Sequence, residues 1–128
     1  MIELMPFAVS MGIRLVESTP QRIVAEMSVR DDLCTAGAIL HGGAVMAFAD
    51  SVAAVGAKLN LPEGASTTTL ESKTNFVGAV RVGDTARAVS EPVHLGRATM
   101  VWQTRIFRGD GKLAAVVTQT QMTIQPRA

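Results

Sequence analysis

Hydrophobic and polar residues alternate along the first part of the chain. Within residues 21–29 every second side chain is apolar, and these positions are Ile23, Ala25, Met27 and Val29. A period of two residues is typical of a strand that buries one face. We expect this strand to pair with residues 12–18 across a turn at Thr19-Pro20.

A long apolar segment lies between residues 41 and 59. It is rich in Ala, Val and Met on nearly all sides, which is typical of a helix that the rest of the protein encloses. Turn-forming residues at 60–64 end it. Because the segment also carries His41, Asp50 and glycines, we interpret it as a core helix and expect no membrane span.

Four strand-like runs occupy the rest of the chain, at residues 66–77, 84–94, 98–108 and 112–124. Asp110-Gly111, between the last two runs, is a good hairpin signal. Pro92 cannot donate a hydrogen bond to a strand ladder, so it predicts a bulge or a free edge in the second run. The order of the runs predicts a meander of four antiparallel strands.

Together the segments predict a single α+β domain over residues 1–128, in which an antiparallel sheet curls around one central helix. The chain has 128 residues and 48% of them are hydrophobic, which is enough to bury a compact core.

The composition of the chain indicates its cellular compartment and excludes some classes of binding partner. The N-terminus carries Glu3 and no basic segment, which argues against a secretory signal. Cys34 is the only cysteine, so we expect no internal disulfide and a cytoplasmic location. A net charge of +1, with one Trp and no Tyr, predicts no nucleic-acid partner.

The charges are unevenly distributed along the chain. Residues 1–64 hold four basic and seven acidic side chains, whereas residues 65–128 hold eight basic and four acidic ones. Two interpretations stay open. The basic excess is either ordinary surface charge on strands or a patch for a small phosphate-bearing ligand.

The segment LHGGAVMAFAD, residues 40–50, contains the candidate chemistry. Asp50 is the only residue with a full formal charge between Asp32 and Lys58. Burying a carboxylate is costly unless something compensates its charge. Asp50 is therefore either a buried carboxylate satisfied by local donors, or a general base or nucleophile in apolar surroundings.

Gly42 and Gly43 stand where the helix is expected to begin. The first N–H groups of a helix have no intrahelical acceptor, so such a terminus can hold an anion or a developing oxyanion. The alternative is that the two glycines only permit a tight turn and close packing.

The spacing of these features constrains a shared site. Asp50 follows Gly42 by eight residues, which is about 12 Å along a helix. A catalytic carboxylate and an oxyanion donor must both lie within about 3 Å of one reacting group. If both are catalytic, two antiparallel copies of the helix have to supply them, across a twofold dimer.

Two other constellations have little support. Cys34 with His41 or His94 would make a thiol nucleophile, but no local motif accompanies them. His41 and His94 with Asp50 would bind a metal, but histidines 53 positions apart lack metal-site spacing. We therefore expect no metal centre.

The motifs AGAILHGGAVMAFADS, TTTLESKTNF, VGD and VHLGRATMVWQTRIF together resemble the hotdog-fold acyl-CoA thioesterases. They are most similar to the PaaI-type group of phenylacetate-pathway and hydroxyaroyl-CoA thioesterases. The resemblance covers residues 12–124. It implies a long helix wrapped by an antiparallel sheet, and homodimers, often paired into tetramers, with the active site between protomers.

The resemblance also implies roles for individual residues. It assigns the catalytic carboxylate to Asp50, the oxyanion-binding N–H to Gly42 and the border of the site to His41. In relatives a hydroxyl on the strand after the helix assists the attacking water. That hydroxyl aligns best with Thr69, and otherwise with Thr68.

Two further sets of residues follow from the resemblance. Thr35 stands where relatives often carry Asn or Gln, and its hydroxyl is suited to hold a water or a carbonyl. The turn near the CoA phosphates corresponds to His94, Gly96 and Arg97, with Arg81 or Arg105 as further phosphate contacts.

The function implied is hydrolysis of an aryl- or medium-chain acyl-CoA thioester to a carboxylic acid and free CoA. CoA is part of the substrate, and no metal or redox cofactor is expected. In relatives the acid either activates water or attacks the thioester itself, and both mechanisms stay open. A non-catalytic acyl-CoA-binding protein and a hotdog hydratase or dehydratase remain the alternatives.

Overall fold

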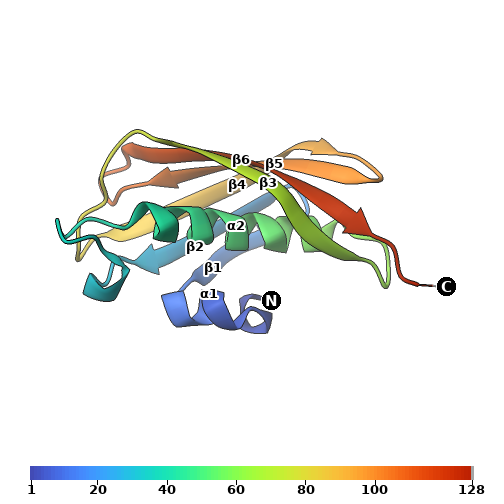
Figure 1. Cartoon of the computed structure of the whole chain (residues 1–128), viewed down its shortest axis with the longest axis horizontal. Helices are drawn as coiled ribbons and strands as arrows, with labels where there is room; N and C mark the ends of the chain where they lie inside the picture. Colours follow the sequence, from blue (N-terminus) through green and yellow to red (C-terminus); the bar gives the residue numbers. More distant parts are fainter. Residues whose placement is uncertain (128) are drawn as a thin grey trace.

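The computed structural model describes residues 1–127. Its centre is a six-stranded antiparallel sheet that packs on one long helix (Figure 1). The strands are β1 (Arg14–Thr19), β2 (Arg22–Ser28), β3 (Ser66–Phe76), β4 (Thr85–Leu95), β5 (Thr99–Phe107) and β6 (Leu113–Ile124). The helix is α2 (Gly42–Leu59). The predicted α+β class and the predicted strand ranges are confirmed to within two residues.

The core lies between α2 and the inner face of the sheet. The alternating residues of β2, from Ile23 to Met27, and Val29 just after the strand are all buried there. Trp102 of β5 lies directly over Gly56 of α2, where a Cβ atom would come within 2.4 Å of the Trp102 ring. Residue 56 therefore has no room for a side chain, and the glycine allows the helix to pack closely against the sheet.

The predicted meander is only partly correct. The sheet order is β1-β2-β4-β5-β6-β3, so β4, β5 and β6 form a meander and β3 does not join it. Instead, β3 pairs antiparallel with β6 and lies at an edge of the sheet. Residues 77–84 connect β3 to β4, and this connection is too long for a tight hairpin, so it carries the chain to another place in the sheet.

Local signals in the second half of the chain are confirmed. The register of β4 against β5 shifts between Pro92 and His94, which is the bulge that the proline predicts. The turn between β5 and β6 contains Asp110 and Gly111, and Gly111 has a φ of +85°. A left-handed conformation of this kind favours glycine.

Two short helices at the N-terminus were not predicted. The 3-10 helix η1 (Ile2–Leu4) and the helix α1 (Pro6–Met11) lie alongside α2, and Ala8 and Met11 of α1 are buried in the core. A helix of six residues shows too little periodicity to be recognised in a sequence. Gly12, with a φ of +77°, ends α1.

Helix α2 is apolar enough and long enough to cross a membrane, with a mean hydropathy of 1.2 over its 18 residues. Its packing argues for a core helix instead, because Phe48, Ala49, Val52 and Ala53 are completely buried against the sheet. The opposite side of α2 is less enclosed. Met46 is exposed, and Ala47, Asp50 and Ala54 are partly exposed.

Candidate active site

Asp50 lies near the middle of α2 and is held by side chains from two strands. Its Oδ1 accepts a hydrogen bond from Thr69 Oγ1 of β3 at 2.7 Å and another from Gln119 Nε2 of β6 at 2.9 Å. The three residues are far apart in the sequence, and the packing of α2 against the β3–β6 pair brings them together. The two bonds fix the orientation of the carboxylate.

The second oxygen of Asp50 is free. Among residues 1–127 no group donates to Oδ2, and this atom is not enclosed. None of the ion pairs in the described chain involves Asp50. The carboxylate therefore has one anchored oxygen and one open oxygen, which is the arrangement that a general base or a nucleophile needs.

A bulge in β3 determines which hydroxyl reaches Asp50. The register of β3 against β6 shifts between Thr69 and Glu71. Thr69 is paired with Gln121, a buried residue, whereas Thr68 is exposed and paired with Met122 on the outer side. Of the two hydroxyls considered from the sequence, the structure brings Thr69 to the carboxylate.

Gln119 and Gln121 were not predicted from the sequence. Both are buried, with exposed fractions of 0% and 2%. Gln119 Nε2 also donates to Gln121 Oε1 at 2.9 Å, and Gln121 Nε2 donates to Thr67 Oγ1 at 3.2 Å. The sequence did contain a signal for them, because Gln119 and Gln121 follow Val117 at every second position of β6 and so share its inward face. Two amides on a buried face need partners, and this points to a polar site.

The N-terminus of α2 lies at another place in the structure. His41 is the N-cap residue, and its Nδ1 accepts a hydrogen bond from the Gly43 N–H at 2.8 Å. This bond requires a neutral imidazole with its proton on Nε2. The Gly42 N–H has no acceptor among residues 1–127, so it is available to an external oxygen.

Gly42 opens onto a cavity of about 380 Å³. Thr35, Val45 and Phe76 line it together with Gly42, and Asp50 is not part of it. The Phe76 ring lies close over the helix start, where a Cβ atom on Gly42 would be 3.2 Å from Cζ. The structure therefore brings Thr35 to Gly42 and leaves both away from the Asp50 carboxylate of the same chain.

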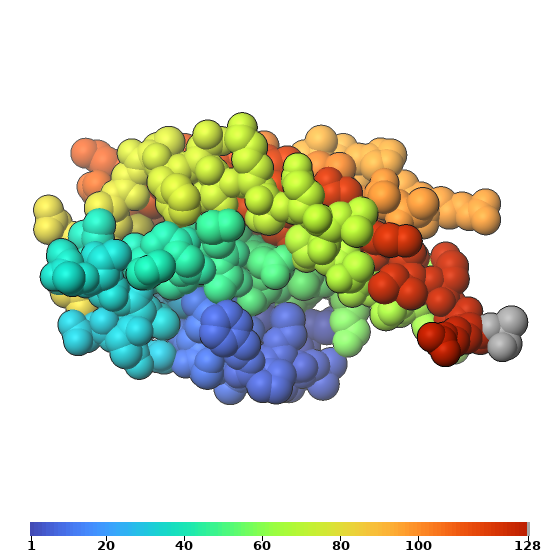
Figure 2. Space-filling model, viewed as in Figure 1, coloured from blue at the N-terminus to red at the C-terminus, as the bar shows by residue number. Residues whose placement is uncertain are grey.

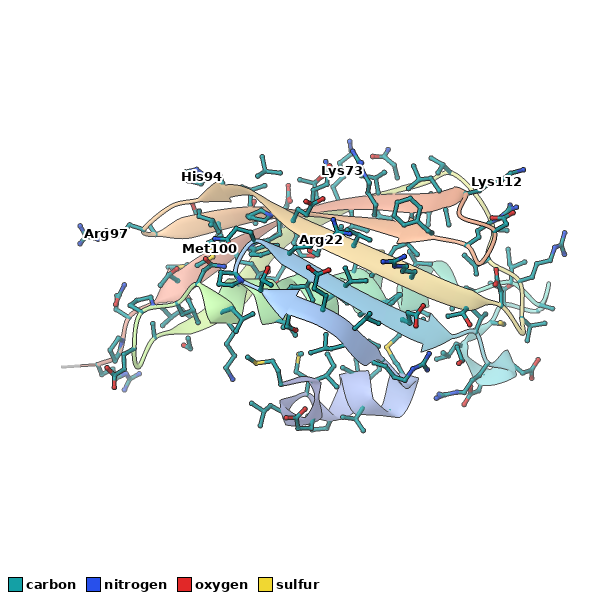
Figure 3. All side chains as sticks on the ribbon, turned by 180° about the vertical axis from the view of Figure 1, so that it is seen from behind. Arg22, Lys73, His94, Arg97, Met100 and Lys112 are labelled. Atoms are coloured by element: carbon teal, nitrogen blue, oxygen red, sulfur yellow. The ribbon has the colours of Figure 1, made fainter. Side chains whose placement is uncertain are left out.

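Gly96 and Arg97 lie in the turn between β4 and β5, and His94, near the end of β4, pairs with Val101 of β5. The Gly96 N–H donates to the Thr99 carbonyl at 2.9 Å. Arg97 extends away from the protein at the tip of this hairpin (Figure 3). The hairpin and the N-terminus of α2 lie at opposite ends of the molecule (Figure 1).

The other predicted phosphate contacts are separate from this turn. Arg105 lies on the outer face of the sheet, where it lines a groove with Arg22 and Arg87. Arg81 lies beside Asp84 in a different surface hollow. The two arginines line different hollows and Arg97 lines neither, so the single chain does not gather the three predicted cations into one patch.

Cys34 does not have the environment of an activated thiol. Its Sγ contacts the Arg30 carbonyl at 3.2 Å and makes no hydrogen bond with His41. Partial burial, with Asp31 and Asp32 nearby, raises the pKa of the Cys34 thiol. A raised pKa disfavours the thiolate. Among residues 1–127 there is also no group of three His, Cys, Asp or Glu side chains that could hold a metal ion.

Two neighbouring surfaces of this chain remain uncovered. The outer edge of β3 pairs with no strand among residues 1–127. Leu70, Phe76 and Val77, on and beside this strand, are 55–59% exposed. The less enclosed side of α2 appears as a teal-to-green band between β3 and α1 (Figure 2). A free strand edge next to apolar side chains is a surface on which another chain can pair.

Comparisons with known proteins identify the family and the fold of this chain. Residues 37–115 match the family model of the Thioesterase superfamily. The solved structure of the thioesterase HI1161 from Haemophilus influenzae is 32% identical, with a TM-score of 0.86, and the alignment covers 92% of this chain and 82% of HI1161.

Two further proteins bear on the resemblance. The structure of Escherichia coli PaaI superposes with a TM-score of 0.89 at 22% identity, over 97% of this chain and 88% of PaaI, and so shares the fold. The 1,4-dihydroxy-2-naphthoyl-CoA hydrolase of Listeria monocytogenes is 25% identical over 107 residues, which are 84% of this chain and 86% of that protein. The hotdog fold implied by the sequence motifs is confirmed.

Proposed function

Since this chain belongs to the Thioesterase superfamily, we propose that it hydrolyses an acyl-CoA thioester to a carboxylic acid and free CoA. The observation that carries this proposal is the Asp50 carboxylate, with Oδ1 held by Thr69 and Gln119 and with Oδ2 open. The choice of a CoA ester is supported by the relative from Listeria, whose name describes a CoA thioester hydrolase. An aryl or a medium-chain acyl group is proposed.

In the proposed reaction, Asp50 supplies the base or the nucleophile. As a base, Oδ2 removes a proton from a water that attacks the thioester carbonyl carbon. As a nucleophile, Oδ2 attacks that carbon itself and forms an anhydride that water then hydrolyses. Both routes use the same open oxygen, and neither requires a metal or a redox cofactor.

The proposed oxyanion donor is the N–H of Gly42. Negative charge develops on the carbonyl oxygen as the tetrahedral intermediate forms. The unpaired N–H at the positive end of α2 stabilises that charge more in the transition state than in the substrate. His41 and Thr35 border this position, since His41 caps the helix and Thr35 lines the cavity beside Gly42.

We further propose that two chains complete each site. Gly42 and Asp50 are eight residues apart on one helix, a separation of about 12 Å. A second copy related by a twofold axis would bring its Gly42 to this Asp50. The uncovered edge of β3 and the adjoining side of α2 offer the surface for such a homodimer. Pairing of dimers into a tetramer remains an expectation from the resemblance.

The CoA moiety is proposed to lie against the β4–β5 hairpin. Arg97 is exposed at its tip, and a guanidinium is well suited to bind phosphate groups. Gly96 lies in the same turn and His94 in the strand that leads into it, and the Thr99 carbonyl oxygen, 2.7 Å from where a Cβ would be, leaves no room for a side chain at residue 96. The proposed location is cytoplasmic, where CoA esters are available.

The decisive experiment measures thiol release from a panel of aryl- and alkyl-CoA thioesters, with the wild type and the Asp50→Asn variant side by side. Release by the wild type and loss in the variant support the proposal. No thiol release from any ester, with CoA esters still bound, would favour the acyl-CoA-binding protein. Consumption of an enoyl-CoA without thiol release would favour the hydratase.

A further inference from the structure

The hydrogen bonds around Asp50 continue beyond its two direct partners. Six contacts join five side chains and one backbone carbonyl into a continuous chain. From the carboxylate the chain passes to Thr69 and Gln119, then to Gln121, and then through Thr67 to the Met122 carbonyl. Its two amides are almost completely buried, so solvent contributes little to these contacts.

The hydroxyl of Thr69 lies at a branch point in this chain. Its Oγ1 is 2.7 Å from Asp50 Oδ1 and 2.6 Å from Gln121 Oε1. Both distances are those of strong O–H···O hydrogen bonds. A threonine hydroxyl has only one proton, however, and neither a carboxylate nor an amide oxygen can donate. Thr69 can therefore serve only one of these two acceptors at a time.

While Asp50 is a carboxylate, the network of hydrogen bonds has one proton too few for its six contacts. The side chains bring five protons to the six contacts: one from each threonine, two from the Gln119 amide and one from the Gln121 amide. Exchanging O and N in Gln121 alone would place two NH₂ groups face to face. Exchanging them in Gln119 would turn an amide oxygen toward the carboxylate.

Protonation of Asp50 changes which of these two acceptors Thr69 prefers. When Oδ2 takes up a proton, Oδ1 becomes a neutral carbonyl oxygen and a weaker acceptor than the amide Oε1 of Gln121, so the Thr69 proton turns to Gln121. Gln119 still donates to Asp50 and to Gln121 in this arrangement. Five of the six contacts have a proton in either state, and only the Thr69 proton changes its partner, with no movement of heavy atoms.

We propose that Thr69 is a hydroxyl switch for Asp50 and that Gln119 and Gln121 are its positioning residues. Thr69 donates to Asp50 while that side chain is a carboxylate, and to Gln121 once Asp50 has become neutral. This inference rests on the proposed function in its general-base form. It gives the buried amides a role in the reaction, in addition to holding the carboxylate.

The two positions of the Thr69 proton correspond to the two protonation states of Asp50 during the proposed hydrolysis. Attack of water on the thioester carbon forms a C–O bond and moves one water proton to Asp50. Breakage of the C–S bond then returns this proton to the departing CoA sulfur. Asp50 is neutral only between these two events, and the Gln121 oxygen is the alternative acceptor for the Thr69 proton during that interval.

The first test compares kcat and KM of four variants. Thr69→Val and Gln121→Met remove the switch and its second acceptor, and Thr69→Ser keeps the hydroxyl. Gln103→Met is the matched control, because Gln103 also donates to a strand hydroxyl, that of Thr118 at 3.4 Å, but on the outer face of the sheet. We expect kcat to fall about tenfold or more in the first two variants with little change in KM, and to be retained in Thr69→Ser and Gln103→Met.

A double-mutant cycle separates a switch from two independent packing effects. Because Gln121 acts through Thr69, the Gln121→Met change should cost little further kcat when Thr69 is already Val. Losses of kcat that simply multiply, or a Gln121→Met variant with full kcat, would overturn the proposal. Thermal unfolding of each variant checks that it is folded.

A spectroscopic readout keeps the test independent of activity. Asp50→Asn mimics the neutral carboxyl, so we expect the side-chain amide NMR signals of Gln119 and Gln121 to shift in this variant, while that of Gln103 stays in place. If the signals of Gln119 and Gln121 did not move, the inference would fail even in an active thioesterase. If they moved in a protein that released no thiol, the network would stand and the proposed function would fail.

Discussion

Gln119 Nε2 lies 2.9 Å from Asp50 Oδ1, although the two residues are 69 positions apart in the sequence. This bond links the last strand to the centre of the helix and leaves Oδ2 without a donor among residues 1–127. In the proposed reaction the two oxygens of this aspartate therefore have separate tasks.

Replacement of Asp50 by Asn should remove the base while keeping the shape of the side chain. We expect turnover of a CoA thioester to fall at least about a hundredfold, because a positioned general base contributes on that scale. The melting temperature and the oligomeric state should stay near those of the wild type. A folded variant with wild-type turnover would exclude Asp50 from the reaction.

The Gly42 N–H can be deleted without breaking the helix. Gly42 is the first residue of α2, a position at which proline is well tolerated, and His41 has the extended φ and ψ of −61° and 138° that precede proline. Gly42→Pro should lower kcat about a hundredfold or more. Gly42→Ala is the control, since it adds a Cβ beside Phe76 and keeps the N–H. Equal losses in both variants would indicate steric effects alone.

A site shared between two chains predicts complementation. Neither Asp50→Asn nor Gly42→Pro dimers hold an intact site, but a mixed dimer has one, built from the normal Asp50 of one chain and the normal Gly42 of the other. With random exchange, half of the dimers are mixed, so activity should recover to about a quarter of the wild-type value. Kinetic assays after co-refolding measure this. A mixture as inactive as its components would place each site within one chain.

Residue 56 should tolerate no larger side chain. A Cβ atom there would lie 2.4 Å from the Trp102 ring, in the middle of the core. Gly56→Ala is expected to lower the free energy of unfolding by about 1–3 kcal/mol through overpacking. Gly37→Ala is a suitable control, because its new Cβ would meet only Thr35 Oγ1 at 3.6 Å. Urea titration of both variants gives the comparison.

The β5–β6 turn should contribute to acid sensitivity. Hydrogen bonds from the Arg108 guanidinium and then from the Lys112 N–H lower the pKa of Asp110 to about 2. An unfolded Asp has a pKa of about 3.9, so this contribution is complete above that pH and is lost as the pH falls toward 2. Asp110→Asn should therefore lose less stability than the wild type between pH 4 and 2. Unfolding curves at both pH values test this, and identical losses would contradict it.

Much of the fold follows from sequence pattern. The alternation at 21–29, the Asp110-Gly111 turn and the apolar segment ending before Asn60 each predict an element that the structure contains. The pairing of β3 with β6 does not follow, because periodicity describes the faces of a strand and not its neighbours. Only the length of the segment at 77–84 hinted that β3 and β4 are not a hairpin.

The candidate site was predictable where one residue stands out from its surroundings. Asp50 is conspicuous in an apolar helix, and its neighbours Thr69 and Gln119 are not conspicuous in strands rich in hydroxyl and amide side chains. Their role depends on contacts across the sheet, which no local window of sequence contains. Gln119 could have been found by asking which polar residues alternate with the buried positions of β6.

The extra residue in β3 affects how this chain should be aligned with others. Thr69 and Phe76 both belong to the inner face of the strand, yet they are separated by an odd number of positions because Leu70 is unpaired at the bulge. Counting back by twos from Phe76 selects Thr68 in place of Thr69. A gap-free alignment anchored on Asn75-Phe76 with a strand that lacks the bulge would therefore match the wrong threonine, and a single gap at residue 70 restores the correspondence.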